Sequence, residues 1–236
     1  MTAYRVVGTL NTNYSVCLKM TLSTHQSKTK LLDAAMQVIR TKGYTATTVD
    51  DICHTAGVTK GSFFHHFKGK EDLAITAANY WADMTGELFK SAPYHAHPDP
   101  LDRVLGYIDF RKSILQGTLP EFTCLVGTMV QETFDTAPAI RDACERSISG
   151  HAATIALDIA AAMKLHNIQA DWTADSLALH TQAVLQGAFI LAKAKGTAQV
   201  AGDSVDHLRR YVEMLFAVRA PSKVLATATS KRTRKT

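Results

Sequence analysis

Apolar residues recur every three to four positions through most of the chain from about residue 27, and they rarely alternate with polar ones. Spacing of this kind is typical of amphipathic helices, and the hairpin dipeptides Asn-Gly and Asp-Gly are absent from the sequence. The pattern therefore predicts an all-α protein. We expect helices over residues 27–42, 48–57, 59–67, 70–89, 100–117, 121–134, 138–166, 173–195 and 204–218, with a loop over 91–100.

The second and third predicted helices have recognisable ends. Thr48 and Asp51 have the spacing of a capping box, and Thr59 is a residue type that caps helix N-termini. Gly57 stands where a helix ends in the left-handed conformation. Two short helices joined by so tight a turn predict a helix-turn-helix motif over residues 48–67.

The helix pattern also divides the chain into four segments. Residues 1–24 lack helical periodicity, so we expect a disordered arm or a mis-assigned start there. A small helical domain is expected at 25–89 and a larger one at 90–220. The polar residues 221–236 are expected to form a basic disordered tail.

Charge separates the two ends of the chain from its middle. Residues 1–72 hold 9 Lys and Arg against 5 Asp and Glu, and residues 221–236 hold 5 against none. Residues 73–220 are acidic, with 12 Lys and Arg against 16 Asp and Glu. A basic segment beside an acidic body indicates a polyanion bound by one part of the molecule, which by charge alone is either nucleic acid or a membrane surface.

Several protein classes are excluded by motif. No apolar run approaches the length of a membrane span, and residues 1–20 lack the compact apolar stretch of a signal peptide. Cys17, Cys53, Cys124 and Cys144 are too widely spaced for a disulfide framework or a zinc site. The common catalytic and phosphate-binding motifs are absent. We therefore expect a cytoplasmic protein that is not an enzyme, with no metal, no cofactor and no membrane partner.

The first turn of the third predicted helix has the composition of a reader of DNA bases. An α-helix fits the major groove, and the residues of its first turn point at base edges. Thr59, Lys60, Gly61 and Ser62 occupy this turn. Lys60 suits guanine O6 and N7, Ser62 is small enough for any base, and Gly61 allows close approach of the backbone.

Residues around this turn suit the DNA phosphates. The Thr48 hydroxyl, Lys70 and free backbone amides lie at helix starts, which attract anions. His65 and His66, one turn further on, can also hydrogen-bond phosphate. The alternative is a pair of packed helices in an ordinary bundle, and it fits poorly with so many polar residues on one helix.

Residues 60–67 read Lys-Gly-Ser-Phe-Phe-His-His-Phe. This run resembles the recognition helix of the TetR family of transcriptional regulators, which commonly reads Lys-Gly-x-Leu-Tyr-x-His-Phe. The resemblance covers roughly residues 25–85. Phe63 replaces the usual Leu, a change within the core, and we expect Phe63 and Phe67 to pack inward as a pair with no role in DNA binding. Phe64 replaces the usual Tyr and so lacks a hydroxyl that often contacts phosphate in the family, which leaves Phe64 to pack on a sugar or on a neighbouring helix.

The resemblance implies a homodimeric, ligand-responsive regulator, most often a repressor, that binds a pseudo-palindromic operator on double-stranded DNA. The helices over 100–166 would enclose a small, mostly apolar effector, and those over 173–195 and 204–218 would form a four-helix dimer interface. The candidate effector-binding residues are Phe110, Cys124, Met129, Glu132, His151 and Gln182. The candidate interface residues are Ala183, Gly187, Leu208, Tyr211 and Leu215.

Two other functions are compatible with the sequence. A sequence-nonspecific or architectural DNA-binding protein would use the basic tail and bind operator and random DNA alike. A helical enzyme with a vestigial DNA-binding head would lose turnover, and keep DNA binding, when a pocket residue is changed.

Overall fold

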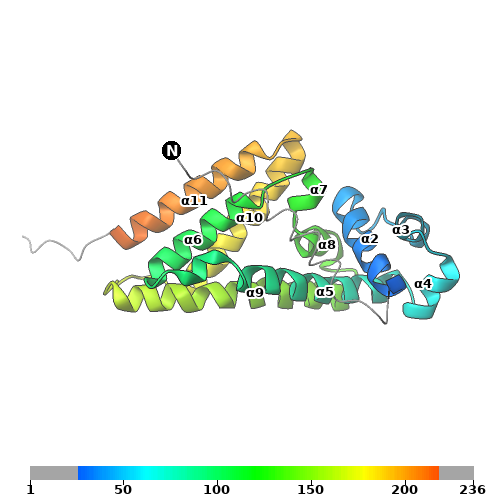
Figure 1. Ribbon diagram of the computed structural model, residues 1–236, viewed down its shortest axis with the longest axis horizontal. Helices are drawn as coiled ribbons and strands as arrows, with labels where there is room; N and C mark the ends of the chain where they lie inside the picture. Colours follow the sequence, from blue (N-terminus) through cyan, green and yellow to red (C-terminus); the bar gives the residue numbers. More distant parts are fainter. Residues whose placement is uncertain (1–25, 218–236) are drawn as a thin grey trace, which may run out of the picture. The chain divides into compact units, whose positions relative to one another are not determined.

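A computed structural model of the chain describes residues 26–217, and every regular element in this span is a helix (Figure 1). The predicted all-α class is confirmed. The predictions for residues 1–24 and 221–236 lie outside the described residues. The elements in chain order are α2 (Gln26–Lys42), α3 (Val49–Ala56), α4 (Lys60–His66), α5 (Lys70–Lys90), the 3-10 helix η1 (Pro93–Ala96), α6 (Pro100–Ser113), α7 (Leu119–Phe122), α8 (Leu125–Thr133), α9 (Pro138–Leu165), α10 (Ala174–Lys195) and α11 (Gln199–Ala217).

The predicted caps around the helix-turn-helix are present. Thr48 and Asp51 form a complete capping box at the start of α3, and Thr59 accepts a hydrogen bond from the Ser62 amide at the start of α4. Gly57 ends α3 at φ 64°, the left-handed region in which a side chain is strained. Local cap chemistry therefore fixes the boundaries of both helices.

Three other predicted boundaries are wrong. The helix expected over 121–134 is two helices, α7 and α8, because the chain turns at Cys124, whose Sγ accepts a hydrogen bond from the Gly127 amide. Helix α6 ends at Ser113 instead of near residue 117. Helix α11 begins at Gln199, five residues before the expected start at Ser204.

The described residues form two compact units, and the division differs from the predicted boundary after residue 89. Unit 1 comprises residues 26–89 together with Gly117–Ile148, and unit 2 comprises Lys90–Gln116 together with residues 149–217. Residues 117–148 belong to unit 1 because buried side chains of α8 and the start of α9 enter the same apolar core as α2 and α5. Sequence order alone does not reveal this packing.

The core of unit 1 lies beneath the helix-turn-helix. Leu31, Ile39, Ile52, Phe63 and Leu73 are completely buried in it. The Phe63 ring lies 5.7 Å from that of Phe67, which is also buried. The recognition helix therefore keeps its orientation by packing Phe63 and Phe67 inward, as the sequence predicts for this pair.

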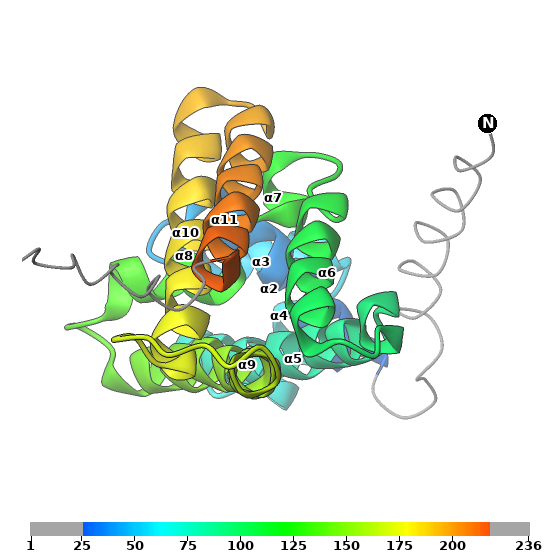
Figure 2. The ribbon, with the colours of Figure 1, turned by 90° about the vertical axis from the view of Figure 1, so that its left-hand side faces the viewer.

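In unit 2, α11 packs against both α10 and α6 (Figure 2). Apolar side chains from these helices and from α9 are buried between them, among them Val104, Ile159, Leu185 and Val212. Within residues 26–217, no helix has the length and hydropathy that crossing a membrane requires.

Candidate nucleic-acid interface

The first turn of α4 presents small and charged groups to the surface. Lys60 and Gly61 are exposed, and Ser62 is half-buried with its amide bonded to Thr59 Oγ1 at 3.2 Å. A Cβ added at Gly61 would meet nothing nearer than that same oxygen, at 3.7 Å. The surface at Gly61 is therefore open to a close approach by another molecule.

Lys60 forms an ion pair with Asp50 of α3. Its Nζ lies 2.8 Å from Asp50 Oδ1, and the two side chains are 60% and 68% exposed. The hydrogen bond and charge of Asp50 raise the pKa of Lys60. Because an exposed ion pair contributes little free energy, a DNA base or phosphate can compete for the Lys60 ammonium.

Phe64 lies on the surface of the recognition helix. It is 58% exposed and contacts the buried Phe63 edge to face, with ring centroids 5.1 Å apart. Of the two positions that the sequence left open, this exposure favours contact with a DNA sugar over packing on a neighbouring helix. An exposed aromatic ring at this site is suited to contact a DNA sugar.

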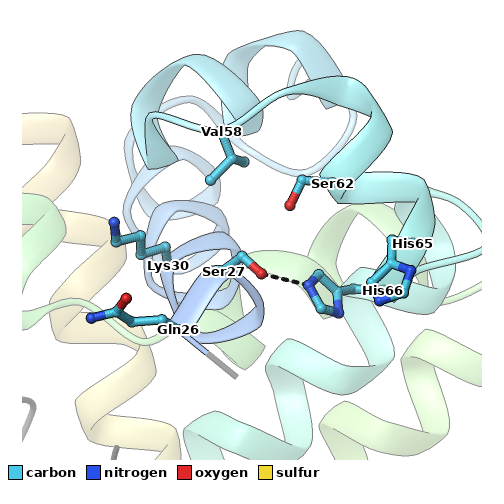
Figure 3. Close-up of a pocket in the computed structure, with 7 residues that line it drawn as sticks. All are labelled: Gln26, Ser27, Lys30, Val58, Ser62, His65 and His66. Atoms are coloured by element: carbon cyan, nitrogen blue, oxygen red, sulfur yellow. Dashed lines mark hydrogen bonds between the residues drawn. The ribbon is translucent and has the colours of Figure 1, made fainter. Parts of the chain in front are cut away.

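A cleft of about 590 Å³ lies between the N-terminus of α2 and α4 (Figure 3). Its lining residues are Gln26, Ser27, Lys30, Val58, Ser62, His65 and His66. Ser27 Oγ and His66 Nε2 are 2.6 Å apart, and the His65 ring lies 4.8 Å from that of His66. A hollow that combines a lysine, two histidines and hydroxyl groups is suited to phosphate oxygens.

The α2 side of this cleft could not be predicted from the sequence. Gln26, Ser27 and Lys30 are 35 or more residues from His65 in sequence, so only the fold brings them beside α4. The sole signal available in the sequence was the polar, basic start of the first helix.

Two predicted phosphate ligands are engaged within the protein. The Thr48 hydroxyl donates to Asp51 Oδ2 at 2.6 Å and accepts from the Asp51 amide at 3.1 Å. Lys70 Nζ donates to the carbonyl oxygens of Tyr44, Thr45 and Thr47 at 3.1, 3.4 and 2.9 Å. Their predicted role as phosphate clamps conflicts with these bonds, which hold the loop between α2 and α3.

Three of the predicted effector-binding residues gather around Tyr107 in unit 2. Gln182 Nε2 donates to the Tyr107 hydroxyl oxygen at 3.0 Å, and His151 Nε2 lies 3.1 Å from it. Phe110 contacts the ring of Tyr94, which itself packs edge to face on Tyr107. This polar cluster is the best-defined candidate for orienting an effector in the described residues.

Arg111 completes the cluster around Tyr107. Its Nε donates to the Tyr107 hydroxyl at 3.0 Å, and its guanidinium lies 5.4 Å from the centre of the Tyr107 ring. Burial and the nearby Arg111 charge lower the pKa of His151 to about 3. His151 is therefore neutral at physiological pH.

The other three predicted effector-binding residues belong to unit 1, and each has a structural role there. Met129 is completely buried in the core, and Cys124 caps α8. Glu132 accepts hydrogen bonds from the backbone amides of Tyr44 and Thr45. Their prediction as effector-binding residues conflicts with these structural roles. Helical spacing could not show that residues 117–148 share the core of α2 and α5.

The predicted interface residues are divided between the surface and the interior of unit 2. Ala183 and Tyr211 are exposed, and Gly187 and Leu215 are half-buried. Leu208 is only 3% exposed because it packs inside this chain, which contradicts its prediction as an interface residue. Further apolar residues, absent from the prediction, are exposed on α10 and α11, namely Leu179, Ile190, Leu191 and Met214.

Two family models match the chain in the order of its elements. Residues 31–77 match the model described as bacterial regulatory proteins of the tetR family. Residues 100–208 match the model described as the tetracyclin repressor-like C-terminal domain. The chain belongs to the TetR family.

Relatives of this TetR-family chain are themselves regulators. YxaF of Bacillus subtilis, an HTH-type transcriptional regulator, is 26% identical over 166 residues, which cover 70% of this chain and 84% of YxaF. YerO of the same organism is 31% identical over 67 residues, 28% of this chain and 23% of YerO. The transcriptional repressor KstR2 of Rhodococcus jostii is 46% identical over 46 residues, 20% of this chain and 22% of KstR2. The last two matches thus span less than a quarter of those proteins.

Solved TetR-family structures share the fold over most of their length. A TetR regulator from Chloroflexus aurantiacus superposes with a TM-score of 0.70 at 26% identity, covering 80% of this chain and 95% of that one. The TetR protein of Rhodobacter sphaeroides gives a TM-score of 0.68 at 23% identity, covering 77% and 96%. As a TetR-family member the chain is a DNA-binding transcriptional regulator, and its family is one of regulators rather than enzymes.

Proposed function

We propose that this TetR-family chain is a repressor that binds a pseudo-palindromic operator as a homodimer and is released by a small, mostly apolar effector. The observation that carries the DNA-binding part is the open first turn of α4, with Lys60, Gly61 and Ser62 beside a cleft suited to phosphate. The repressor part is supported by the 46-residue match to KstR2, whose name describes a repressor.

Selection from a random duplex library with the full chain tests operator binding. We expect enriched duplexes with two half-sites whose centres are about 34 Å apart, because two recognition helices must enter successive major grooves on one face. Enrichment of no sequence, with equal affinity for every duplex, would favour the architectural alternative.

Substitutions of two lysines distinguish contacts with DNA bases from contacts with phosphates. Lys60→Ala should cost about 1 to 3 kcal/mol of operator binding and relax the preference for one guanine in each half-site. Lys30→Ala removes one positive charge per subunit from the cleft, so it should weaken binding to all sequences uniformly. It should also lower the salt slope, the slope of log affinity against log salt concentration, by about one per subunit. Binding measured for the selected and a scrambled duplex at several salt concentrations distinguishes the two results.

The exposed apolar residues of α10 and α11 support the dimer. Leu179, Ala183 and Ile190 recur at helical spacing on one face of α10, and Tyr211 and Met214 are exposed on α11. We assign this surface as the interface. Ile190→Asp should give monomers in sedimentation, whereas Leu157→Asp, at an apolar α9 residue 74% exposed, should leave the dimer intact.

The cluster around Tyr107 supports an effector site in unit 2. Buried polar groups that hydrogen-bond one another can exchange partners with a bound ligand. A thermal-shift screen of small apolar compounds should yield a binder that weakens operator affinity by about 5- to 150-fold, the usual range of such coupling. Operator should weaken the binder by the same factor, and Gln182→Ala should reduce its binding. Equal effector affinity with and without saturating operator would contradict regulation.

A further inference from the structure

The loop between α2 and α3, residues 43–48, is held by a carboxylate that is distant in sequence. The Tyr44 amide donates to Glu132 Oε1 at 3.0 Å, and the Thr45 amide donates to Glu132 Oε2 at 2.7 Å. Both oxygens of one carboxylate thus bind two consecutive backbone N–H groups. Hydrogen bonds to an ionised group are shorter and stronger than neutral ones, so Glu132 fixes the loop from the α8 side.

Lys70 holds the same loop by binding the carbonyl groups of the loop backbone. Its ammonium donates to the oxygens of Tyr44, Thr45 and Thr47, and it lies 4.4 Å from the centre of the Tyr44 ring. An ammonium has three N–H donors, and here three carbonyl oxygens occupy them. The carboxylate of Glu132 in α8 therefore accepts hydrogen bonds from the loop amides, and the ammonium of Lys70 in α5 donates hydrogen bonds to the loop carbonyls.

The loop's first residue provides room for the Glu132 carboxylate. Gly43 has φ 87°, and a Cβ at this residue would lie 2.4 Å from Glu132 Oε1. The Thr47 hydroxyl donates to the Gly43 carbonyl at 2.6 Å, and Thr47 is 1% exposed. Gly43 and Thr47, on either side of the two residues that bind Glu132, thus hold the loop backbone in one conformation.

The position of this loop, together with the inward packing of Phe63 and Phe67, determines where the recognition helix lies. Thr48 ends the loop and caps α3, and α3 is only eight residues long and leads through the Gly57 turn into α4. A displacement of the loop is therefore transmitted to Lys60 and Ser62, and base contacts tolerate displacements of only about 0.5 Å.

We propose that Glu132 and Lys70 are positioning residues for operator binding, acting through the α2–α3 loop without touching DNA. The inference rests on the proposed operator binding. Glu132 lies in the region that matches the family's C-terminal model, residues 100–208, whereas the loop lies in the N-terminal match, residues 31–77. We call the hydrogen bonds of Glu132 and Lys70 to the α2–α3 loop the clamp. The clamp joins the two family regions directly, in addition to the chain connection through α5.

The first test compares Glu132→Gln with Asp135→Asn. Each variant removes one negative charge from the same part of the chain, but Asp135 is exposed and does not bind the loop. We expect Glu132→Gln to lower affinity for the selected duplex about tenfold or more, since one charge-assisted bond is lost and the other weakened. Affinity for a scrambled duplex should change equally in both variants.

Simple electrostatics predicts the opposite sign for this test. Removing a negative charge reduces repulsion from DNA, so it would raise the affinity for every duplex in both variants. A Glu132→Gln protein that binds the selected duplex as well as Asp135→Asn does would overturn the proposal.

The second test uses the salt dependence of Lys70→Ala. The clamp predicts weaker binding to the selected duplex at an unchanged salt slope, whereas loss of a phosphate contact would lower the slope by about one per subunit, as in Lys30→Ala. Lys70→Arg should restore part of the affinity, because a guanidinium also donates to carbonyls. A lowered slope for Lys70→Ala would return Lys70 to the phosphate contacts and overturn its role in the clamp.

Amide hydrogen exchange separates failure of the clamp from failure of the proposed function. In the full wild-type chain the Tyr44 and Thr45 amides should be protected, and Glu132→Gln should accelerate exchange at these two sites while the core amides of α2 stay protected. Unaltered exchange would overturn the clamp. Failure of the wild type to select any duplex would instead overturn operator binding. A variant that loses protection throughout unit 1 is unfolded, and the Lys70 measurements then decide.

Discussion

Unit 1 and unit 2 both have an apolar core, but their buried polar side chains have different partners. Thr47 and Thr133 of unit 1 donate to backbone carbonyls, whereas Tyr107 and Gln182 of unit 2 bond each other's side chains. A backbone partner is fixed by the fold, whereas a side-chain partner can be exchanged for a group of a ligand. The comparison assigns fixed geometry to the DNA-binding unit and adaptable contacts to the other.

The largest expected effect comes from opening a cavity in unit 1. Phe63→Ala should lower the free energy of unfolding by about 3 to 5 kcal/mol, because the ring is completely buried. Phe64→Ala removes an identical ring that is 58% exposed, so it should cost far less. Urea denaturation of both variants tests this contrast, and similar losses would mean that the core beneath α4 is not close-packed.

Removing one hydroxyl should destabilise unit 2. Tyr107→Phe leaves Gln182 and Arg111 without the oxygen to which they donate, so we expect a loss of about 1 to 3 kcal/mol. Tyr211→Phe makes the same change at a residue that is 42% exposed and should be nearly neutral. Equal unfolding midpoints for Tyr107→Phe and the wild type would show that the cluster contributes no stability.

Acidification should also act on unit 2. The folded-state pKa of His151 is lowered to about 3 from a usual value of 6.5, so the unfolded chain binds the extra proton between these pH values. His151 therefore reduces stability as the pH falls below about 6.5, by at most about 1.4 kcal/mol per pH unit. His151→Gln should flatten the stability profile between pH 6.5 and 4 relative to the wild type, and a parallel profile would contradict the lowered pKa.

The smallest effect should have the opposite sign, and it concerns a polar group in unit 1. Asp33 Oδ1 is buried without a hydrogen-bond partner, and burial raises the pKa of Asp33 although a bond to Tyr80 opposes the shift. A raised folded-state pKa means that stability is lost as the pH rises through it.

Asp33→Asn should therefore stabilise the protein by a few tenths to about 1 kcal/mol at pH 7. It should have no effect at pH 3, where Asp33 is protonated. Denaturation at both pH values measures the difference, and destabilisation at pH 7 would show that the ionised carboxylate is needed.

Sequence reasoning succeeded where the determining chemistry is local. Thr48, Asp51 and Thr59 cap helices through hydrogen bonds within three residues, so their spacing reveals the boundaries. Phe63 and Phe67 were assigned to the core because a recognition helix must bury one face. The break at Cys124 was missed because a thiol is an uncommon N-cap.

Contacts between distant segments could not be predicted in this way. Glu132 lies 87 and 88 residues from its amide donors, and its carboxylate in the sequence looks like any polar group on a helix. Leu208 shows a second limit, since periodicity identifies a buried face but not whether the same protomer or a partner buries it. Lys70 shows a third, because backbone carbonyls, which it binds, are present at every residue.

The close approach of Gly43 to Glu132 limits how this protein can be recombined with its relatives. A hybrid made by joining its first 89 residues to the remainder of another family member would lose Glu132 while retaining the loop that needs it. The reverse hybrid would join the first part of the relative to residues 90–236 of this protein. If the relative had a larger residue in place of Gly43, the side chain of that residue would collide with the Glu132 carboxylate. The exchangeable module is therefore discontinuous in sequence. To give a regulator a new operator, residues 117–148 should be exchanged together with the helix-turn-helix segment up to Phe89.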